Sequence, residues 1–419
     1  MERLRIGLLS YEYPPETGLG GIGTYTWTQA QALARAGHEV HVLAGSAAPG
    51  PKASAARRER DGDVTVWRDA APASARRLGA VLGRLGWWWS RNRLENGLRM
   101  RRLLGRVAAR EKLDLVEVPE CGGEGLFLPR RWETRKVVRF HSPAELIMPF
   151  YDTRPGDRRL CAWLERRGYR RAAAATSCSA FLAREVAHRL GYRQPIVTVP
   201  NGIDLTQADG ASTFDLRAAI GATGATGAGA AEPVVLFAGR FEPRKGSALL
   251  GELVPELLAR RSLHFVVLGE DLFGHGEREL VPRCRARQGE PQTGALHLLG
   301  RRPVEDVRAA MRQADVVLLP SRWENAPYTV LEAMAAGAPL VVSRVGGIPE
   351  LVADGSEALV VADQDVAAHL TAVRLLLDNR ELAQSLGAAA RRRVEREFTA
   401  DGMAERSLGV YRRVVEGAG

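Results

Sequence analysis

The sequence predicts an α/β protein with two doubly wound, Rossmann-like domains. Short segments dominated by apolar residues recur along the 419-residue chain, and amphipathic helical stretches such as 24–36 and 305–313 lie between most of them. Apolar strands that alternate with helices are typical of parallel sheets covered on both faces. There are too many such segments for one sheet, so two domains are expected. The predicted strands are 6–9, 40–43, 115–118, 137–140, 196–199, 234–237, 265–268, 316–319 and 340–342.

The junction of the two domains is predicted near a low-complexity stretch. Residues 206–232 contain a run of glycine, alanine and threonine, which offers no large apolar side chains for packing. Its glycines argue against an alanine-rich helix, which is the alternative. We therefore expect a flexible loop close to the domain boundary.

The composition is that of an ordinary globular protein. Hydrophobic residues make up 45% and charged residues 26% of the chain. No apolar run approaches the ~18 residues that a membrane helix needs. The N-terminus lacks a signal peptide, so we expect a cytoplasmic protein. The net charge of +10 comes almost entirely from arginine and surrounds no recognisable nucleic-acid fold, so no nucleic-acid partner is expected.

Cysteine spacing excludes two classes of site. None of the four cysteines forms a Cys-x-x-Cys pair, so neither a zinc ribbon nor a thioredoxin-like motif is present. We expect buried, reduced thiols. The cysteines are Cys121, Cys161, Cys178 and Cys284.

A basic, tryptophan-rich stretch has two interpretations. Residues 76–112 hold eleven Arg/Lys and two Glu, with Trp87-Trp88-Trp89 among them. Such a stretch can lie in a membrane interface, which would make the protein peripheral at the inner membrane face. Alternatively, these residues form helices with a solvated basic face, and the tryptophans pack on the sheet.

The first chemical motif is a glycine loop after the first strand. Residues 18–23 fit G-x-G-x-x-G, the dinucleotide fingerprint. The segment 11–17, with two prolines, intervenes after the strand, and no carboxylate follows the second strand at 43–46. Both observations weigh against an NAD-dependent oxidoreductase. The loop still exposes backbone N–H groups before a helix, where a phosphate can bind. A plain tight turn is the alternative.

The second motif is a cationic loop after the strand 234–237. Arg240 offers a planar fork for phosphate oxygens, and Lys245 offers a compact positive charge. Charges beside a surface loop are also common without a ligand.

The third motif carries two glutamates within residues 324–334. Ionised carboxylates such as Glu324 and Glu332 are strong acceptors for sugar hydroxyls. The backbone N–H groups of Thr329 and Val330 would face a phosphate if the helix begins near Val330. Ordinary helix-start glutamates are the alternative.

These three motifs, in this order and separation, resemble the retaining glycosyltransferases of family 4, which have the GT-B fold. Further agreement comes from His141 at a strand end and from residues 199–204, 299–300, 333–342 and 346–350. The resemblance implies two Rossmann-like domains that face a central cleft. We expect an acceptor-side domain at 1–204, a nucleotide-sugar-binding domain at 205–399, and a C-terminal helix at about 400–419 that packs back on the first domain.

The resemblance also implies roles for individual residues. Arg240 and Lys245 would clamp the diphosphate, with Gly21 at the donor phosphates. Glu332 would hold the ribose, and Glu324 and His141 would contact the transferred sugar. Asn325, Thr329 and Val330 would complete the donor site, and Arg301 would present backbone to the base. Glu117 and Glu120 are candidates for the acceptor side, or belong to a solvated turn.

One departure concerns the donor sugar. The family often has Glu-Gly-Phe-Gly where this chain has Glu324-Asn325-Ala326-Pro327. Pro327 has no backbone N–H to donate, and Asn325 and Ala326 change the wall beside the sugar. The nucleotide clamp is therefore better defined than the sugar.

The expected activity is retaining, metal-independent hexosyl transfer. The donor would be a nucleoside diphosphate sugar, with UDP as the first choice, and the acceptor a hydroxyl in glycan, glycolipid or natural-product biosynthesis. No metal or cofactor is expected, because cationic side chains would hold the diphosphate. The Asp-x-Asp at 61–63 is expected to be a turn before a strand at 64–67. The alternatives are a non-catalytic nucleotide-sugar-binding protein and, less favoured, an NAD-dependent oxidoreductase.

Overall fold

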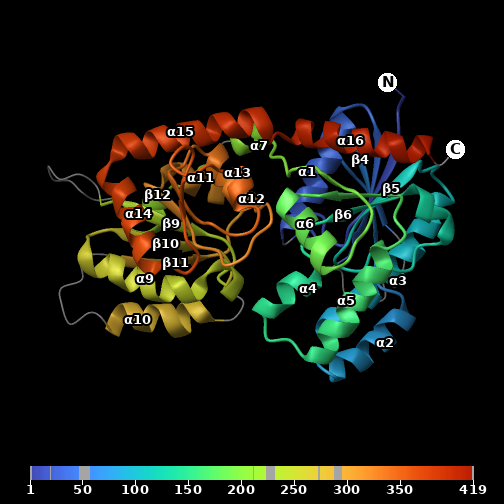
Figure 1. Cartoon of the computed structure of the whole chain (residues 1–419), viewed down its shortest axis with the longest axis horizontal. Helices are drawn as coiled ribbons and strands as arrows, with labels where there is room; N and C mark the ends of the chain where they lie inside the picture. Colours follow the sequence, from blue (N-terminus) through green and yellow to red (C-terminus); the bar gives the residue numbers. More distant parts are fainter. Residues whose placement is uncertain are drawn as a thin grey trace. The chain divides into compact units, whose positions relative to one another are not determined.

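The computed structural model divides into two compact units, Met1–Gly202 with Ala400–Gly419, and Ile203–Thr399 (Figure 1). It describes residues 2–18, 20–46, 57–210, 212–222, 232–271, 274–286 and 295–417. The division falls two residues before the boundary that we placed after residue 204. The C-terminal segment belongs to the first unit, as the resemblance implied.

The first unit is built on an eight-stranded sheet of order β3-β4-β2-β1-β5-β6-β7-β8. All neighbours are parallel except β3 and β4. Residues of β4, β5 and β6 are buried at every position, so helices cover both faces. The strands are β1 (Arg5–Leu9), β2 (Glu39–Gly45), β3 (Arg57–Asp61), β4 (Val64–Asp69), β5 (Leu115–Pro119), β6 (Lys136–Phe140), β7 (Ala174–Ser177) and β8 (Ile196–Thr198).

The helices of the first unit include the C-terminal one. Tyr411 and Leu408 of α16 pack with Leu33 of α1 and with the strands in one core cluster, which holds the end of the chain on this sheet. The helices are α1 (Gly21–Arg35), α2 (Ala73–Arg84), α3 (Trp88–Ala108), η2 (Arg130–Arg135), α4 (Ala144–Ile147), η3 (Met148–Phe150), α5 (Pro155–Tyr169), α6 (Ala180–Arg189) and α16 (Ala400–Glu416).

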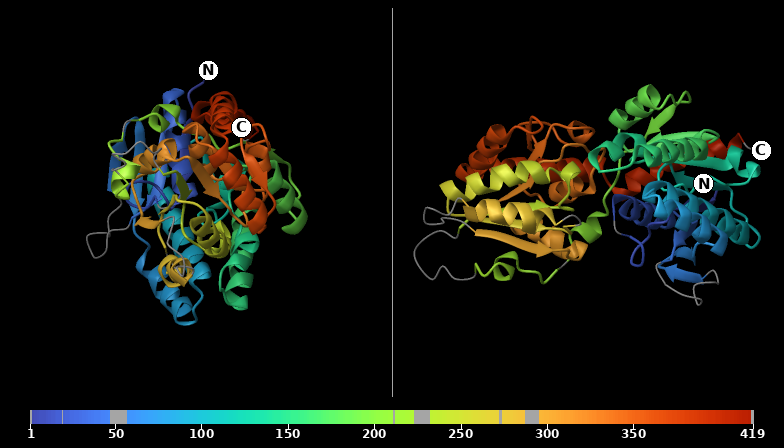
Figure 2. Two further views of the ribbon diagram at one scale, coloured as in Figure 1. Left: turned by 90° about the vertical axis from the view of Figure 1, so that its left-hand side faces the viewer. Right: turned by 90° about the horizontal axis from the view of Figure 1, so that it is seen from below.

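The second unit has a parallel sheet of order β11-β10-β9-β12-β13-β14. Helices lie on both sides of its strands (Figure 2). The strands are β9 (Val234–Ala238), β10 (His264–Leu268), β11 (Ala295–Gly300), β12 (Val316–Leu319), β13 (Leu340–Ser343) and β14 (Leu359–Val361). The helices are α7 (Leu205–Ala208), α8 (Leu216–Ala219), η4 (Pro243–Lys245), α9 (Ser247–Arg260), η5 (Gly276–Leu280), α10 (Val281–Ala286), α11 (Val304–Gln313), α12 (Tyr328–Ala335), α13 (Ile348–Leu351), α14 (Val366–Asp378) and α15 (Arg380–Glu397).

The predicted strands are confirmed, but several others were missed. β3 consists of Arg-Arg-Glu-Arg-Asp, and an edge strand with charged side chains has no apolar pattern to detect. β7 is built from small residues, and β11 and β14 are only partly apolar or very short. Residue 211 and residues 223–231 of the predicted loop 206–232 lie outside the described residues. The described part of this segment contains the short helix α8 and most of the short helix α7.

The Asp-x-Asp segment forms a turn between the antiparallel strands β3 and β4, as predicted. The Asp61 carboxylate accepts hydrogen bonds from the hydroxyl of Tyr13 at 2.7 Å and the indole N–H of Trp27 at 3.0 Å. It therefore holds α1 and the loop after β1 to the sheet edge. All four cysteines are buried and free.

Candidate active site

The cationic loop and the paired glutamates come together at the carboxyl edge of the second sheet. β9 and β12 are parallel neighbours, so the loops that follow them meet at one edge, where open α/β sheets bind ligands. Gly246 has φ +88°, and a Cβ there would lie 2.0 Å from the carbonyl oxygen of Pro320. Only glycine lets the first loop pass this close to the second, and the approach places Lys245 beside Glu324.

Glu324 is buried between two cations. Its Oε1 contacts the ammonium of Lys245, and its Oε2 lies 3.1 Å from Arg244. Burial alone would raise the pKa of the Glu324 carboxyl, but Lys245 and Arg244 lower it below its ordinary value. Burial is also the main reason why the pKa of Lys245 is lowered. The carboxylate is thus ionised and paired with two cations, and its contact with the transferred sugar stays a prediction.

Arg244 is the residue of this cluster that the sequence interpretation missed. It lies 2.9 Å from Glu242 and also contacts Glu324, while Arg240 lies 3.4 Å from the same Glu242. Three cations therefore face two carboxylates, which leaves a net charge of +1 to meet an anion. The signal was available, because Arg244 directly precedes Lys245 in the motif.

The loop after β13 supports Glu324 from behind. Gly346 has φ +57°, and a Cβ there would lie 1.6 Å from the carbonyl oxygen of Glu324. The next residue, Gly347, donates its N–H to the same oxygen at 3.2 Å. The glycine pair at 346–347 thus fixes the backbone that carries Glu324. Asn325 follows in a buried position.

The helix after Glu324 begins at Tyr328, two residues earlier than assumed. Val330 consequently donates its N–H to Pro327 at 3.1 Å, so this group is used inside the first turn and does not face a phosphate as predicted. Thr329 lies beside it in the same turn.

Glu332 and Arg301 belong to the same unit. Glu332 is buried 3.4 Å from Arg308 of α11. Burial raises the pKa of Glu332, and Arg308 opposes that effect. No pattern in the sequence singled out Arg308. Arg301 follows β11 and is exposed.

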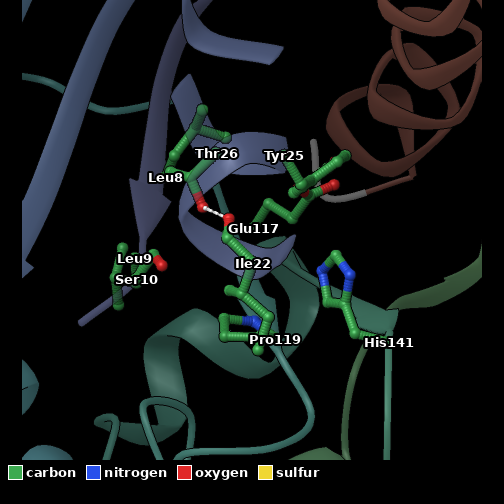
Figure 3. A pocket seen from close by; sticks show the side chains of 9 residues that line it. All are labelled: Leu8, Leu9, Ser10, Ile22, Tyr25, Thr26, Glu117, Pro119 and His141. Carbon is green, nitrogen blue, oxygen red and sulfur yellow. Dashed lines mark hydrogen bonds between the residues drawn. The ribbon is translucent and has the colours of Figure 1, made fainter. Parts of the chain in front are cut away.

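His141 lies at the corresponding edge of the first sheet. It follows β6 and packs edge-on against Tyr25 of α1, with ring centroids 4.8 Å apart. Burial, and then the charge of Arg139, hold the pKa of His141 well below its ordinary value, so its imidazole is neutral at pH 7. Figure 3 shows His141 with Tyr25, Glu117 and Pro119 around a cavity of about 10 Å³, room for at most one water molecule.

Glu117 does not face an acceptor, and neither alternative suggested for it is right. Its carboxylate is buried and accepts hydrogen bonds from the hydroxyls of Tyr25 at 2.6 Å and Tyr411 at 2.7 Å. Because Tyr411 belongs to α16, this carboxylate ties the C-terminal helix to β5. An apolar strand with one glutamate cannot reveal such a partner, since Tyr411 lies almost 300 residues further along the chain.

Glu120 is likewise buried, and the prediction of an acceptor contact or a solvated turn is wrong. Its two oxygens accept the backbone N–H groups of His141 at 2.8 Å and Ser142 at 2.6 Å. Two residues further on, Ala144 donates its N–H to Glu165 at 2.8 Å. Buried carboxylates therefore shape the loop that carries His141.

Gly21 begins α1, three residues before the helix start that we expected. The N–H of Gly23 donates to the carboxylate of Glu12 at 3.1 Å. A Cβ at Gly20 would lie 3.1 Å from that same carboxylate. Glu12, which the motif analysis did not consider, thus lies against the helix start where a phosphate was predicted.

One cluster among the described residues has the spacing of metal ligands, namely Glu39, His41 and Glu111. The indole N–H of Trp67 points at Nδ1 of His41 at 3.3 Å, so the ring proton is on Nε2, which lies 3.0 Å from Glu39. A metal at Nε2 would have to displace this proton. The cluster begins β2, at the edge of the sheet opposite to His141, and so lies apart from the candidate site.

Glu124 gives the first unit a testable pH dependence. Its side chain is buried, with one oxygen accepting the N–H of Tyr11 at 3.1 Å, and burial raises its pKa to about 7. Since this pKa is higher than in the unfolded chain, the stabilising contribution is complete below about pH 4.5 and is lost as the pH rises through about 7. The full loss is about 3 kcal/mol.

We therefore expect Glu124→Gln to raise the thermal midpoint relative to the parent at pH 8 and to leave the difference small at pH 5. Exposed Glu405 provides the matched control, Glu405→Gln, which should follow the parent at both values. If Glu124→Gln and the parent show the same change in thermal midpoint between the two pH values, the ionisation of Glu124 does not cause the pH dependence of stability.

Comparison with known proteins identifies the family. A family model described as Glycosyltransferase Family 4 matches residues 19–207, and one described as Glycosyl transferases group 1 matches residues 225–393. Glycogen synthase of Mycobacterium tuberculosis is 28% identical over 97% of this chain and 94% of its own. The MMP alpha-(1->4)-mannosyltransferase of Mycolicibacterium hassiacum is 27% identical over 98% of each chain.

Solved structures agree on the fold. A sucrose-phosphate synthase from Thermosynechococcus elongatus superposes with a TM-score of 0.75 at 20% identity, over 99% of this chain and 100% of that one. Both family models together span nearly the whole chain, and the motifs at Arg240, Lys245 and Glu324 lie within the second. The chain belongs to glycosyltransferase family 4 and is a hexosyltransferase of the GT-B fold that uses a nucleotide sugar.

Proposed function

We propose that this glycosyltransferase moves a hexose from a UDP-sugar to an acceptor hydroxyl, with retention of configuration and without a metal or cofactor. The observation that carries the proposal is the cluster of Arg240, Arg244 and Lys245 at the carboxyl edge of the second sheet, with a net charge of +1. Cleavage of the anomeric bond puts negative charge on the diphosphate. Fixed cations next to that charge stabilise the transition state.

The choice of UDP rests on related proteins. An Anabaena protein of TM-score 0.64 was solved in complex with UDP, and an E. coli protein of TM-score 0.70 with UDP-2-fluoro glucose. A starch synthase from Arabidopsis of TM-score 0.71 was solved with ADP, which makes ADP the competing nucleotide. Relatives named glycogen synthase and alpha-maltose-1-phosphate synthase support a sugar hydroxyl as the acceptor.

In the proposed mechanism the acceptor hydroxyl attacks the anomeric carbon on the same face of the sugar from which the phosphate departs. The departing phosphate takes the proton of the acceptor hydroxyl, so the reaction needs no separate base. Neutral His141 lines the reaction centre and offers a hydrogen bond to the sugar without adding positive charge next to the developing oxocarbenium ion. Glu332 holds the ribose, as the family resemblance implies.

A thermal-shift panel with UDP, GDP, ADP, dTDP and NAD tests the proposal. A ligand at ~100 times its dissociation constant stabilises the folded state by about 2.7 kcal/mol. We expect UDP to raise the midpoint most, with EDTA leaving both this shift and transfer activity unchanged. A shift with NAD alone would indicate the oxidoreductase, and a UDP shift without turnover on any acceptor would indicate the non-catalytic binding protein. Activity lost with EDTA and restored by Mg²⁺ would contradict the metal-free mechanism.

We also propose that the protein contacts the inner face of a membrane near Trp87–Trp89. Only Trp88 is available for such a contact. Trp87 packs on Gly156 of α5, and the ring of Trp89 lies 5.6 Å from that of Tyr151. The alternative that these tryptophans pack on the sheet is wrong, since Trp87 and Trp89 pack on α5 and on the residue after η3.

A further inference from the structure

Helix α2 exposes an apolar stripe. Leu78, Val81 and Leu85 follow one another at helical spacing and are 47%, 53% and 47% exposed. The adjoining face of the helix packs against α3 through buried Ala75 and Leu82. The apolar surface of the helix is therefore wider than the part that α3 covers, and the rest faces solvent.

Trp88 extends this stripe at the start of α3. It is 56% exposed, and a Cβ at Gly83 would lie 3.6 Å from its ring, so the indole stands beside the end of α2. We call Leu78, Val81, Leu85 and Trp88 the α2 stripe. An interfacial tryptophan next to exposed aliphatic side chains is typical of helices that lie in a membrane surface.

The α2 stripe is flanked by positive charge without a compensating negative charge. Residues 73–94 contain no Asp or Glu. Within the described part of the chain, none of Arg76, Arg77 and Arg84 forms an ion pair, and all three are exposed. A protein surface of free guanidinium groups beside large aliphatic side chains is complementary to anionic headgroups over an acyl layer.

Room for a headgroup lies next to the α2 stripe. A depression of about 440 Å³ opens beside Trp88 and is walled by Trp89, Thr153 and Arg154. Arg154 adds a further exposed guanidinium at its rim. Among the described residues, no helix is both long and apolar enough to cross a bilayer, so the contact would be made from one side.

We propose that the α2 stripe and its arginines dock the first unit on a membrane of anionic lipids. The aliphatic side chains enter the boundary of the acyl layer, and Arg77 and Arg84, which lie beside the stripe on the helix surface, pair with headgroup phosphates. This inference rests on the membrane contact proposed above, for which it names the surface and the class of lipid. It does not depend on sugar transfer, because vesicle binding is measured without donor or turnover.

Flotation of the full chain with phosphatidylcholine vesicles, with and without phosphatidylglycerol, tests the proposal. We expect binding only to the anionic vesicles and weaker binding at high salt. Each arginine near an anionic surface contributes about 1 kcal/mol, so Arg77→Gln/Arg84→Gln should lower the partition coefficient on the order of 30-fold. Leu78→Ser/Val81→Ser/Leu85→Ser should lower it at least about tenfold.

The matched control is Leu375→Ser, since Leu375 lies on α14 of the second unit and is 44% exposed. It should bind vesicles as the parent does. All these side chains are exposed, so an unchanged thermal midpoint and unchanged transfer to a water-soluble acceptor should accompany each variant. The proposal is overturned if the parent fails to float with anionic vesicles, as expected if an acidic protein covers α2 instead, or if the arginine variant and the aliphatic variant both float like the parent.

Discussion

Lys245→Ala should lower the rate of sugar transfer on the order of 10²–10³-fold, the cost of removing one preorganised group next to a developing anion. The ammonium is buried and lies against Glu324 in the cluster that would receive the diphosphate. Alanine leaves no positive charge at that point, and Arg240 and Arg244 cannot replace it while they are also paired with Glu242. The rate of single turnover with UDP-sugar measures the loss.

Two further variants separate catalysis from stability. Lys112 is an exposed lysine of the first unit, so Lys112→Ala should retain the parental rate. Lys245→Ala leaves Glu324 with Arg244 as its partner, and a buried carboxylate that loses a cation destabilises the fold. Adding Glu324→Gln should restore the thermal midpoint but not the rate. Recovery of the rate in the double variant would mean that Lys245 serves Glu324 alone and not the diphosphate.

Above about pH 8, where the Glu120 carboxyl is ionised, Glu120→Gln should lower kcat by about 10- to 100-fold and leave the KM for the donor nearly unchanged. This is the scale expected when a reacting group is displaced by about 1 Å. Both oxygens of Glu120 accept N–H groups of the loop that carries His141. An amide has one acceptor, and its NH₂ group would face a second N–H. The loop must then shift, and the imidazole shifts with it.

The pH profile distinguishes this positioning role from a general loss of structure. Burial, and then the charge of Glu165, raise the pKa of Glu120 to about 8, while the two backbone donors oppose this rise. The ionised form holds both N–H groups, so kcat of the parent should increase as the pH rises through about 8. Glu120→Gln should lack this increase. Glu124→Gln, in the same buried loop but without contact to His141, should keep both kcat and the profile; a profile unchanged in Glu120→Gln would refute the role of Glu120.

The sequence by itself determined the class of fold and the location of the cationic motif. Exposing apolar side chains to water is unfavourable, so short apolar segments such as 234–237 and 316–319 are expected to form buried strands. Once two strands are parallel neighbours, the residues after them share an edge. That Arg240, Lys245 and Glu324 meet was implied by the family resemblance, because their order along the chain does not say that β9 and β12 are neighbours.

The partners of buried polar groups were decided only by the tertiary structure. Glu117 and Glu120 are only three residues apart in the sequence. Nevertheless, the Glu117 carboxylate accepts hydroxyls of α1 and α16, and the Glu120 carboxylate accepts a backbone N–H group after β6. A carboxylate can accept from any donor within about 3 Å, and sequence distance does not limit which donors folding brings there. The same holds for Arg244, whose bridge between Glu242 and Glu324 exists only because two loops approach over Gly246.

The exposure of the α2 stripe was likewise decided only by the tertiary structure. The pattern of Leu78, Val81 and Leu85 predicts an amphipathic helix, but a periodic pattern does not say how much of the apolar face a neighbour will cover. In the folded unit α3 covers Ala75 and Leu82 and leaves the stripe in water. Patterning along the chain thus determines what each element must bury, and the packing of neighbouring elements decides which apolar and charged groups remain for a ligand, a substrate or a membrane.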